Sequence, residues 1–328
     1  MQSFSTRAAA GGALFGFTFI LLLSTASEAC TSCGCSVVTD WTGTELQPAT
    51  GLRLSARYDY VDQNTLHSGN DKVDTAAITL PSDDELQQYT LTRFYTIGAD
   101  YSLDTDWSLN AELPWLDRDH ATIAEDSTAV TTSHTRGIGD LRLLARYNGS
   151  YGGLLPGRVL GLQFGLKLPT GAFHDVFSDG PAAGETIDRG LQNGTGTTDL
   201  LLGVYNAGSL APRWQRYEQL QLKQPLNSRE GFKPSTQLML NLGLRYVATP
   251  WLAPQLQLNG RIEGRELGPQ GDYDNSGSQT LYLSPGLTVG SATGLSGYGF
   301  VQLPVYQHYT GSQLAPDYLV SVGLSYRY

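Results

Sequence analysis

The chain has 328 residues, of which 16% are charged, and its 21 Lys and Arg against 31 Asp and Glu give a formal net charge of -10. This acidic balance excludes a typical nucleic-acid-binding protein, because neutralisation of phosphates supplies most of that affinity. The 38 glycines, the 18 tyrosines and the low charge content suit tight turns and strands and argue against a soluble helical protein.

The N-terminal residues predict export. Arg7 precedes an apolar run from Ala13 to Leu23, and small residues lead on to Ala29. These are the parts of a secretory signal peptide with an Ala-type cleavage site, and the run is too short for a transmembrane helix of roughly 20 residues. No long apolar stretch follows, and the mean hydropathy is -0.22. We therefore expect residues 1–29 to be removed and any membrane insertion to use strands.

All 3 cysteines, Cys30, Cys33 and Cys35, lie at the expected mature N-terminus. Their thiolates could hold a soft metal ion, Cu(I) or Zn(II), while an oxidising periplasm would favour a disulfide. Lipidation of Cys30 is a third alternative, although the residues before it resemble a lipobox poorly. We expect residues 30–48 to form a periplasmic tail whose chemistry or periplasmic partner is separable from folding.

Residues 49–328 predict an all-β fold, a transmembrane antiparallel β-barrel of about twelve strands in the bacterial outer membrane. Alternation of apolar with small or polar residues is typical of strands that are apolar on one face, and aromatic residues near both ends of a strand match two membrane interfaces. The weakest strand is 213–223, where Arg216 and Glu218 share a face with Leu220. The predicted strands are 52–60, 95–101, 107–115, 140–147, 160–168, 199–204, 213–223, 238–246, 252–262, 281–289, 297–306 and 318–328.

The links between these strands are alternately long and short. The long ones are 62–87, 118–134, 173–194, 224–234 and 264–278, and clear short ones are 102–106, 248–250 and 291–294. Outer-membrane barrels show this asymmetry, with long extracellular loops, short periplasmic turns and both termini in the periplasm. A soluble β-sandwich or propeller also alternates, but these strands exceed the usual 5–6 residues and no fixed-period repeat is present.

The faces opposite the apolar ones predict a lumen lined by charges of both signs. Because eight strands give a filled interior and sixteen a wide channel, about twelve predict a narrow path for small solutes. The alternative is that the charges pair with one another in a filled, rigid interior. The predicted lumen and selectivity residues are Arg53, Arg57, Asp59, Glu112, Asp140, Arg142, Arg146, Lys167, Asp199, Arg245, Arg261 and Arg327.

Three short motifs carry a family resemblance. They are Gly137-Ile138-Gly139-Asp140-Leu141, Leu168-Pro169-Thr170-Gly171 and Gly196-Thr197-Thr198-Asp199-Leu200. Together they resemble the outer-membrane transporters associated with the meta-cleavage pathway of phenol degradation. The resemblance implies a barrel that admits small solutes, aromatic or hydrophobic ones among them. We expect Asp140 and Asp199 to face inward near Arg142 or Arg146.

Two other classes of function remain open in the sequence. One is a structural or docking barrel whose cysteine tail recruits a periplasmic partner. The other is an outer-membrane lipid hydrolase, which needs a Ser–His pair supported by an acidic or amide group. The candidate Ser–His pairs are Ser133 with His134 and Ser312 with His308, and the sequence identifies no third catalytic group for either pair. We therefore expect no enzymatic activity, no catalytic residue and no cofactor apart from a metal ion at the cysteines.

Overall fold

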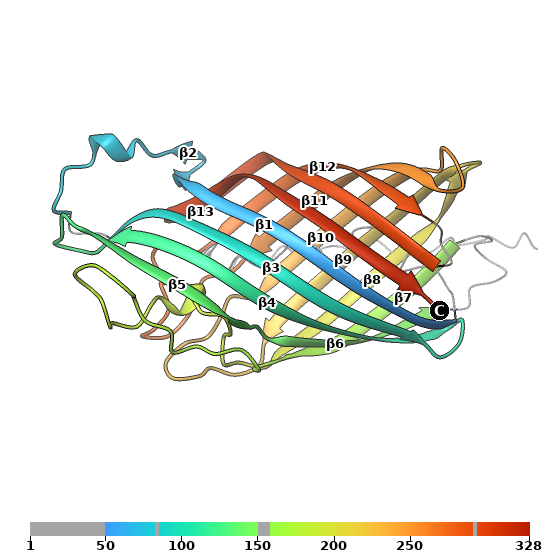
Figure 1. Cartoon of the computed structure of the whole chain (residues 1–328), viewed down its shortest axis with the longest axis horizontal. Helices are drawn as coiled ribbons and strands as arrows, with labels where there is room; N and C mark the ends of the chain where they lie inside the picture. The colour runs from blue at the N-terminus through green and yellow to red at the C-terminus, as the bar shows by residue number, and fades with distance from the viewer. Residues whose placement is uncertain (1–49, 83–84, 150–157, 291–293) are drawn as a thin grey trace, which may run out of the picture.

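The computed structural model describes residues 50–82, 85–149, 158–290 and 294–328, which form one closed antiparallel barrel (Figure 1). The strands pair mostly in chain order, and the last pairs with the first to close the wall. The strands are β1 Gly51–Gly69, β2 Asp71–Lys72, β3 Leu86–Ser102, β4 Trp107–Ile123, β5 Val130–Ile138, β6 Leu141–Gly149, β7 Arg158–Leu168, β8 Asp199–Ala211, β9 Trp214–Pro225, β10 Gln237–Tyr246, β11 Leu252–Glu263, β12 Ser278–Gly290 and β13 Gly294–Arg327. Short 3₁₀ helices span Thr75–Ala77 and Arg189–Leu191. No helix in these ranges is long and apolar enough to cross a membrane.

The predicted twelve crossings of the barrel wall are confirmed, although three of them are built in an unexpected way. β5 and β6 both pair with β4 and act as one strand interrupted at Gly139 and Asp140. The predicted strands 297–306 and 318–328 are parts of the single 34-residue β13. Its first half pairs with β12 and its second half with β1, and the chain reverses near Gly311, whose φ is +60°.

The strands extend further toward the long-loop end than the sequence predicts. Residues 62–69, 118–123 and 130–134 belong to β1, β4 and β5 instead of to loops, as do residues 86–87 to β3. Cross-strand pairing continues there, while the outer face turns polar at Asp117 and Asp119. The apolar alternation therefore ends at the edge of the membrane, whereas the backbone hydrogen bonds between the strands continue beyond it.

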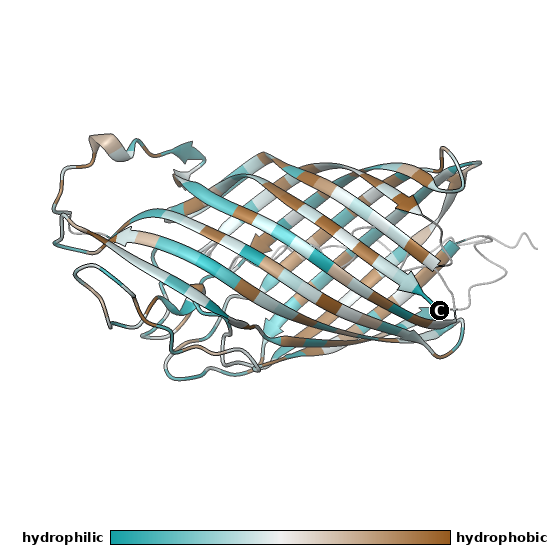
Figure 2. Cartoon of the chain, viewed as in Figure 1, coloured by the Kyte–Doolittle hydropathy of each residue, from teal (hydrophilic) through white to brown (hydrophobic). Residues whose placement is uncertain are grey.

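The outer surface carries an apolar band between two sets of aromatic side chains. Brown and teal residues alternate along the strands in Figure 2. The Trp107–Tyr147 and Trp214–Tyr246 ring pairs, each 4.9 Å apart, lie at the short-turn end. The Tyr95–Trp115 pair, 5.5 Å apart, lies further along the wall. Such a band with aromatic girdles on a closed barrel is characteristic of the bacterial outer membrane, where this chain therefore resides.

The weakly predicted strand is real and corresponds to β9. Arg216 and Glu218 face outward, as their shared face with Leu220 required, and they form an ion pair with each other. Asn206 also donates to Glu218 at 2.9 Å. These mutually satisfied polar groups lie near the turn end of the strand, which explains why the apolar alternation fails there.

Aromatic side chains inside the barrel lie flat on glycines of the neighbouring strand. A Cβ at Gly286 would come within 2.1 Å of the Phe300 ring, and one at Gly323 within 2.3 Å of the Tyr298 ring. Any larger residue at these two glycines would push the ring away from the wall. The arrangement keeps bulky rings out of the centre of the lumen.

The two ends of the barrel can be distinguished by labelling. The long links at the left of Figure 1 should be extracellular, and the short turns should be periplasmic with the C-terminus. Single cysteines replacing Asn70, Asp126, Asp179 and Asp274, all exposed, should react with an impermeant maleimide on intact cells. A cysteine at Asp104 in the β3–β4 turn should react only after permeabilisation. The reverse pattern would invert the orientation.

Candidate functional site

The C-terminal part of the link between β7 and β8, which spans residues 169–198, packs against the inner wall of the barrel. Arg118 of β4, which is 2% exposed, donates to the carbonyl oxygens of Leu191 and Gln192. Ile187 and Leu191 are each 2% exposed, so this part of the link is covered by the barrel. We call residues 169–198 the inner loop. Its position makes it the obvious constriction of any path through the lumen.

The three motifs of the family resemblance meet at the root of the inner loop. Asp140 accepts hydrogen bonds from Gly171 N at 3.0 Å and from Thr195 N at 3.1 Å. The hydroxyl of Thr170 donates to Gly139 O at 2.8 Å. A Cβ at Gly139 would lie 2.7 Å from Leu116 Cδ1 and 3.3 Å from Asn193 O, so glycine is needed for this close approach.

Asp140 and Asp199 both face inward, as expected, and both form ion pairs with Lys167. Lys167 Nζ lies 2.7 Å from Asp140 and 3.2 Å from Asp199. All three side chains are at most 7% exposed. Lys167 lies two residues before Pro169, so the ion pairs fix both roots of the inner loop to the wall. Charge-assisted contacts of this kind are stronger than neutral hydrogen bonds.

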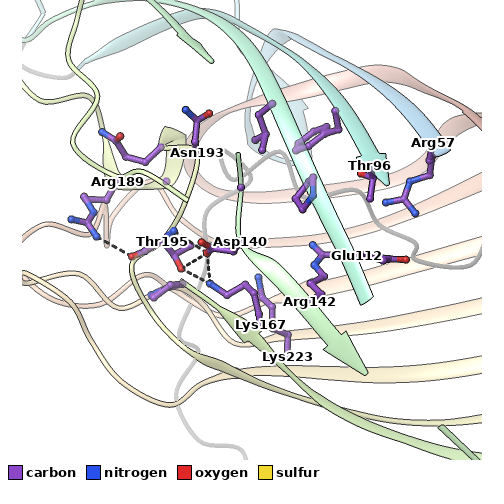
Figure 3. Close-up of a pocket in the computed structure, with 17 residues that line it drawn as sticks. Arg57, Thr96, Glu112, Asp140, Arg142, Lys167, Arg189, Asn193, Thr195 and Lys223 are labelled. Atoms are coloured by element: carbon purple, nitrogen blue, oxygen red, sulfur yellow. Dashed lines mark hydrogen bonds and ion pairs between the residues drawn. The ribbon is translucent and has the colours of Figure 1, made fainter. Parts of the chain in front are cut away.

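A cavity lies between the inner loop and the opposite lumen wall (Figure 3). Its cavity volume is about 80 Å³, and the adjoining space that opens to solvent brings the total to about 790 Å³. Figure 3 shows Arg142, Lys167 and Lys223 gathered on one side, with Arg189 and Asn193 coming from the inner loop. The residues that line it are Arg57, Phe94, Thr96, Glu112, Pro114, Leu116, Gly139, Asp140, Arg142, Lys167, Arg189, Gly190, Gln192, Asn193, Thr195, Lys223 and Pro234.

The twelve charges predicted for the lumen are all buried or half-buried. Several pair along the wall: Arg146 with Asp100 at 2.6 Å, Arg57 with Asp59 at 2.7 Å, and Arg261 with Glu263 at 3.2 Å. The lumen therefore combines paired charges with open space. Their effect on selectivity stays a prediction.

Sequence reasoning missed four polar residues that shape the site. Asp100 lies within the predicted strand 95–101, on the inward face opposite Tyr95 and Ile97, but was not included among the lumen residues. Arg118 lies on the inward face of β4 beyond the predicted end of that strand at residue 115. Lys223 was hidden in the weakly predicted strand. Arg189 lies in the inner loop, with its guanidinium 4.3 Å from the Phe173 ring and 5.1 Å from the Phe232 ring. Nothing local in the sequence places that residue inside the barrel.

The rest of the lumen wall combines a ladder of amide groups with an apolar cluster. An amide ladder crosses β7 to β12, in which Gln219 donates to Gln163 and Asn241 to Gln219, both at 3.1 Å, and Asn259 donates to Asn241 at 3.0 Å. Ser284 donates to Asn259 at 2.6 Å. An apolar cluster on β1, β3, β4, β12 and β13 consists of Val61, Phe94, Leu116, Tyr282, Phe300 and Leu319. Phe94 and Leu116 of this cluster also line the cavity.

The position of the inner loop should depend on pH through Asp188. Burial raises the pKa of this carboxyl to about 7, and the charges of Glu85 and Asp272 add to the rise. The proton is held more tightly in the packed loop than in a released one, so packing is favoured at acid pH and weakens as pH rises from about 4 to about 7.

Hydrogen exchange of residues 187–193, corrected for intrinsic rates, should show protection that falls over this pH range. The Asp188→Asn variant should show protection that is nearly independent of pH. Protection that instead increased with pH in the wild-type protein would contradict the assignment.

The only described group of metal-ligand type lies outside the lumen. Ligand atoms of Asp117, Asp119 and His134 lie within 4.8 Å of one another on the outer face, in residues 85–149. The two carboxylates already pair with Arg93 at 3.3 and 3.0 Å, and Asp119 accepts from His134 Nδ1 at 2.5 Å. The group is thus an internally neutralised ion-pair network.

Neither candidate Ser–His pair of a hydrolase is formed among the described residues. Ser133 is buried and faces inward, whereas His134 faces outward, because consecutive strand residues point to opposite faces. His308 Nδ1 lies 2.5 Å from Asn70 Oδ1, and Ser312 N donates to Asn275. The predicted signal peptide and the cysteines of the tail lie outside the described residues.

No protein-family model and no curated protein sequence matches the chain. An outer-membrane channel from Pseudomonas putida F1 has the same fold, with a TM-score of 0.63, 13% identity, and coverage of 89% of this chain and 100% of that one. Weaker likenesses, whose scores are too low to carry an argument, are the transport unit of the autotransporter AIDA-I from Escherichia coli (TM-score 0.47, 11% identity, 89% and 93% coverage) and the Ralstonia pickettii toluene transporter TbuX (0.42, 10%, 87% and 93%). By fold, the chain is a bacterial outer-membrane β-barrel.

Proposed function

We propose that the chain is an outer-membrane channel that passes small solutes through a narrow, charge-lined lumen. The observation that carries this proposal is the inner loop, fixed over an open cavity inside a barrel whose bulky rings lie flat on the wall. A purely structural barrel has no need of such space. The partners implied are outer-membrane lipid outside and a small-molecule solute inside.

The solute class that the lumen favours includes aromatic and partly apolar compounds. Phe94 lines the cavity and packs in one cluster with the buried Tyr282 and Phe300, so it offers an aromatic contact to a solute, while the amide ladder and the charges keep the path hydrated. The resemblance of the three motifs to transporters of the phenol meta-cleavage pathway points in the same direction. Phenolic compounds are therefore among the first solutes to assay.

Conductance of the refolded protein in a planar bilayer tests the proposal. Gly171 and Gly194 are in backbone contact, since a Cβ at Gly171 would lie 2.7 Å from Gly194 Cα. Residues 172–193 can therefore be removed and Gly171 joined directly to Gly194, which preserves the root at Asp140. We expect discrete conductance from the wild-type chain and a severalfold larger one from the shortened chain. The absence of conductance from both folded proteins would refute the channel function.

We propose a separate role for Cys30, Cys33 and Cys35 in soft-metal or disulfide chemistry, based on their spacing alone. Replacing all three with serine should abolish bound Cu(I) or Zn(II), measured by mass spectrometry, or thiol reactivity, measured by alkylation. Barrel assembly and conductance should not change, because the barrel begins at Gly51. A wild-type tail without metal, disulfide or lipid would end this proposal.

A further inference from the structure

The lining of the cavity is basic, although the chain as a whole carries a net charge of -10. Two carboxylates line it, and each lies beside a cation: Asp140 pairs with Lys167 at 2.7 Å, and Glu112 interacts with Arg57. The cations of the lining are Arg57, Arg142, Lys167, Arg189 and Lys223. Asp59 and Asp199, which are not part of the lining, also pair with Arg57 and Lys167. The five cations and these four carboxylates leave an excess of one positive charge.

Arg142 is the cation best placed to meet a solute. It lies on β6 in register with Glu112 of β4 and Lys167 of β7, and its side chain lines the cavity. It has no hydrogen-bond or ion-pair partner in the part of the chain that the structure describes. A half-buried guanidinium is stabilised by a carboxylate, to which it can donate two parallel hydrogen bonds.

The cavity also offers an apolar surface. Phe94, Pro114, Leu116 and Pro234 line it, and the first and third of these continue into the apolar cluster of the lumen wall. Basic and apolar groups thus face the same space. Ligand sites commonly combine an apolar lining with a few polar groups that fix orientation.

We propose that this cavity binds small organic anions that join one carboxylate to an aromatic or aliphatic body, and that this binding is the selective step of passage. The carboxylate lies at Arg142, near Lys223, and the body packs against Phe94 and Leu116. The statement about passage rests on the proposed channel function, whereas binding of the anion at this site does not depend on it.

Equilibrium dialysis of the refolded full-length chain in detergent tests the site directly. The probes are benzoate, benzyl alcohol and benzylamine, which share a ring and differ in charge. We expect benzoate to bind about tenfold more tightly than the alcohol, the value of one charge-assisted hydrogen-bonded contact, and benzylamine to bind most weakly. Equal binding of the three would overturn the proposal.

Variants separate the contributions of the basic and apolar groups. Arg142→Gln should weaken benzoate binding about tenfold and leave benzyl alcohol unchanged, whereas Phe94→Ala should weaken both. The matched control is Arg136→Gln on the outer face, where the side chain is 60% exposed and pairs with Asp117. It should change nothing. A benzoate affinity that survives Arg142→Gln would overturn the assignment.

The zero-current potential in a KCl gradient separates failure of this inference from failure of the channel. The wild-type chain should prefer chloride over potassium, and Arg142→Gln should reduce that preference while heat-modifiable migration stays intact. Conductance without a preference for anions would overturn the inference and keep the channel. Benzoate binding without conductance would keep the site and refute the channel.

Discussion

Replacing Arg146 with glutamine should lower the free energy of unfolding by about 3 kcal/mol, because it leaves a buried carboxylate without its main partner. Arg146 is 1% exposed, and its Nη1 lies 2.6 Å from Asp100 Oδ2. The range for breaking such a pair is about 3–5 kcal/mol, and the lower end applies since Arg53 stays 3.8 Å from Asp100. Urea unfolding followed by tryptophan fluorescence measures the change.

The matched control for Arg146 is Arg142→Gln, four residues earlier on the same face of β6. It breaks no ion pair among the described residues, so it should lower the free energy of unfolding far less than the Arg146 variant does. Its main effect should be on which solutes the protein binds. The sequence alone treats these two arginines as equivalent lumen charges. Equal losses of stability in the two variants would show that the Arg146–Asp100 contact is not a stabilising pair.

Replacing Leu202 with arginine should lower the free energy of unfolding by about 2–4 kcal/mol and slow assembly into the membrane, because it places a charge near the middle of the lipid-facing band. Leu202 is 40% exposed on the outer surface, in register with Phe164 and Leu222. Heat-modifiable migration and urea unfolding in lipid vesicles measure the effect. Leu242 is a poorer choice, since it is in register with Glu218, which would partner an introduced arginine.

Leu210→Arg provides the control for depth. Leu210 faces outward on the same strand, is 58% exposed and lies at the short-turn end of β8. A charge near the interface costs only about 0–1 kcal/mol. If both variants were equally stable, the band around Leu202 would not face lipid.

The inner loop makes sense of motifs whose role is obscure in the linear sequence. Gly139-Asp140, Thr170-Gly171 and Asp199 lie far apart along the chain, but hydrogen bonds and the shared ion-pair partner Lys167 join them at one place on the wall. Their glycines permit close backbone approach, and their polar side chains bind the loop to the wall. The three motifs thus concern the attachment of the inner loop to the wall more than the strands around it.

The sequence by itself determined the barrel, its twelve crossings and the inward faces. Period-two alternation is a local property of each strand, and lipid on one side enforces it without help from distant residues, as in 238–246 and 318–328. The same pattern placed Arg142 and Asp140 inside. It failed where no lipid imposes it: in the outer ends of β1 and β4, and at the outward pair Arg216–Glu218.

Only the tertiary structure decided which inward charges pair and which face the cavity. Lys167 instead of Arg146 holds Asp140, because strand register and the return of the inner loop bring Lys167 and Thr195 to that carboxylate. Arg146 is held by Asp100 across the lumen wall, on a strand 46 residues away. Pairing depends on contacts between distant segments, and alternation within a strand carries no information about them. The basic character of the cavity, and with it the class of solute proposed here, follows from those contacts.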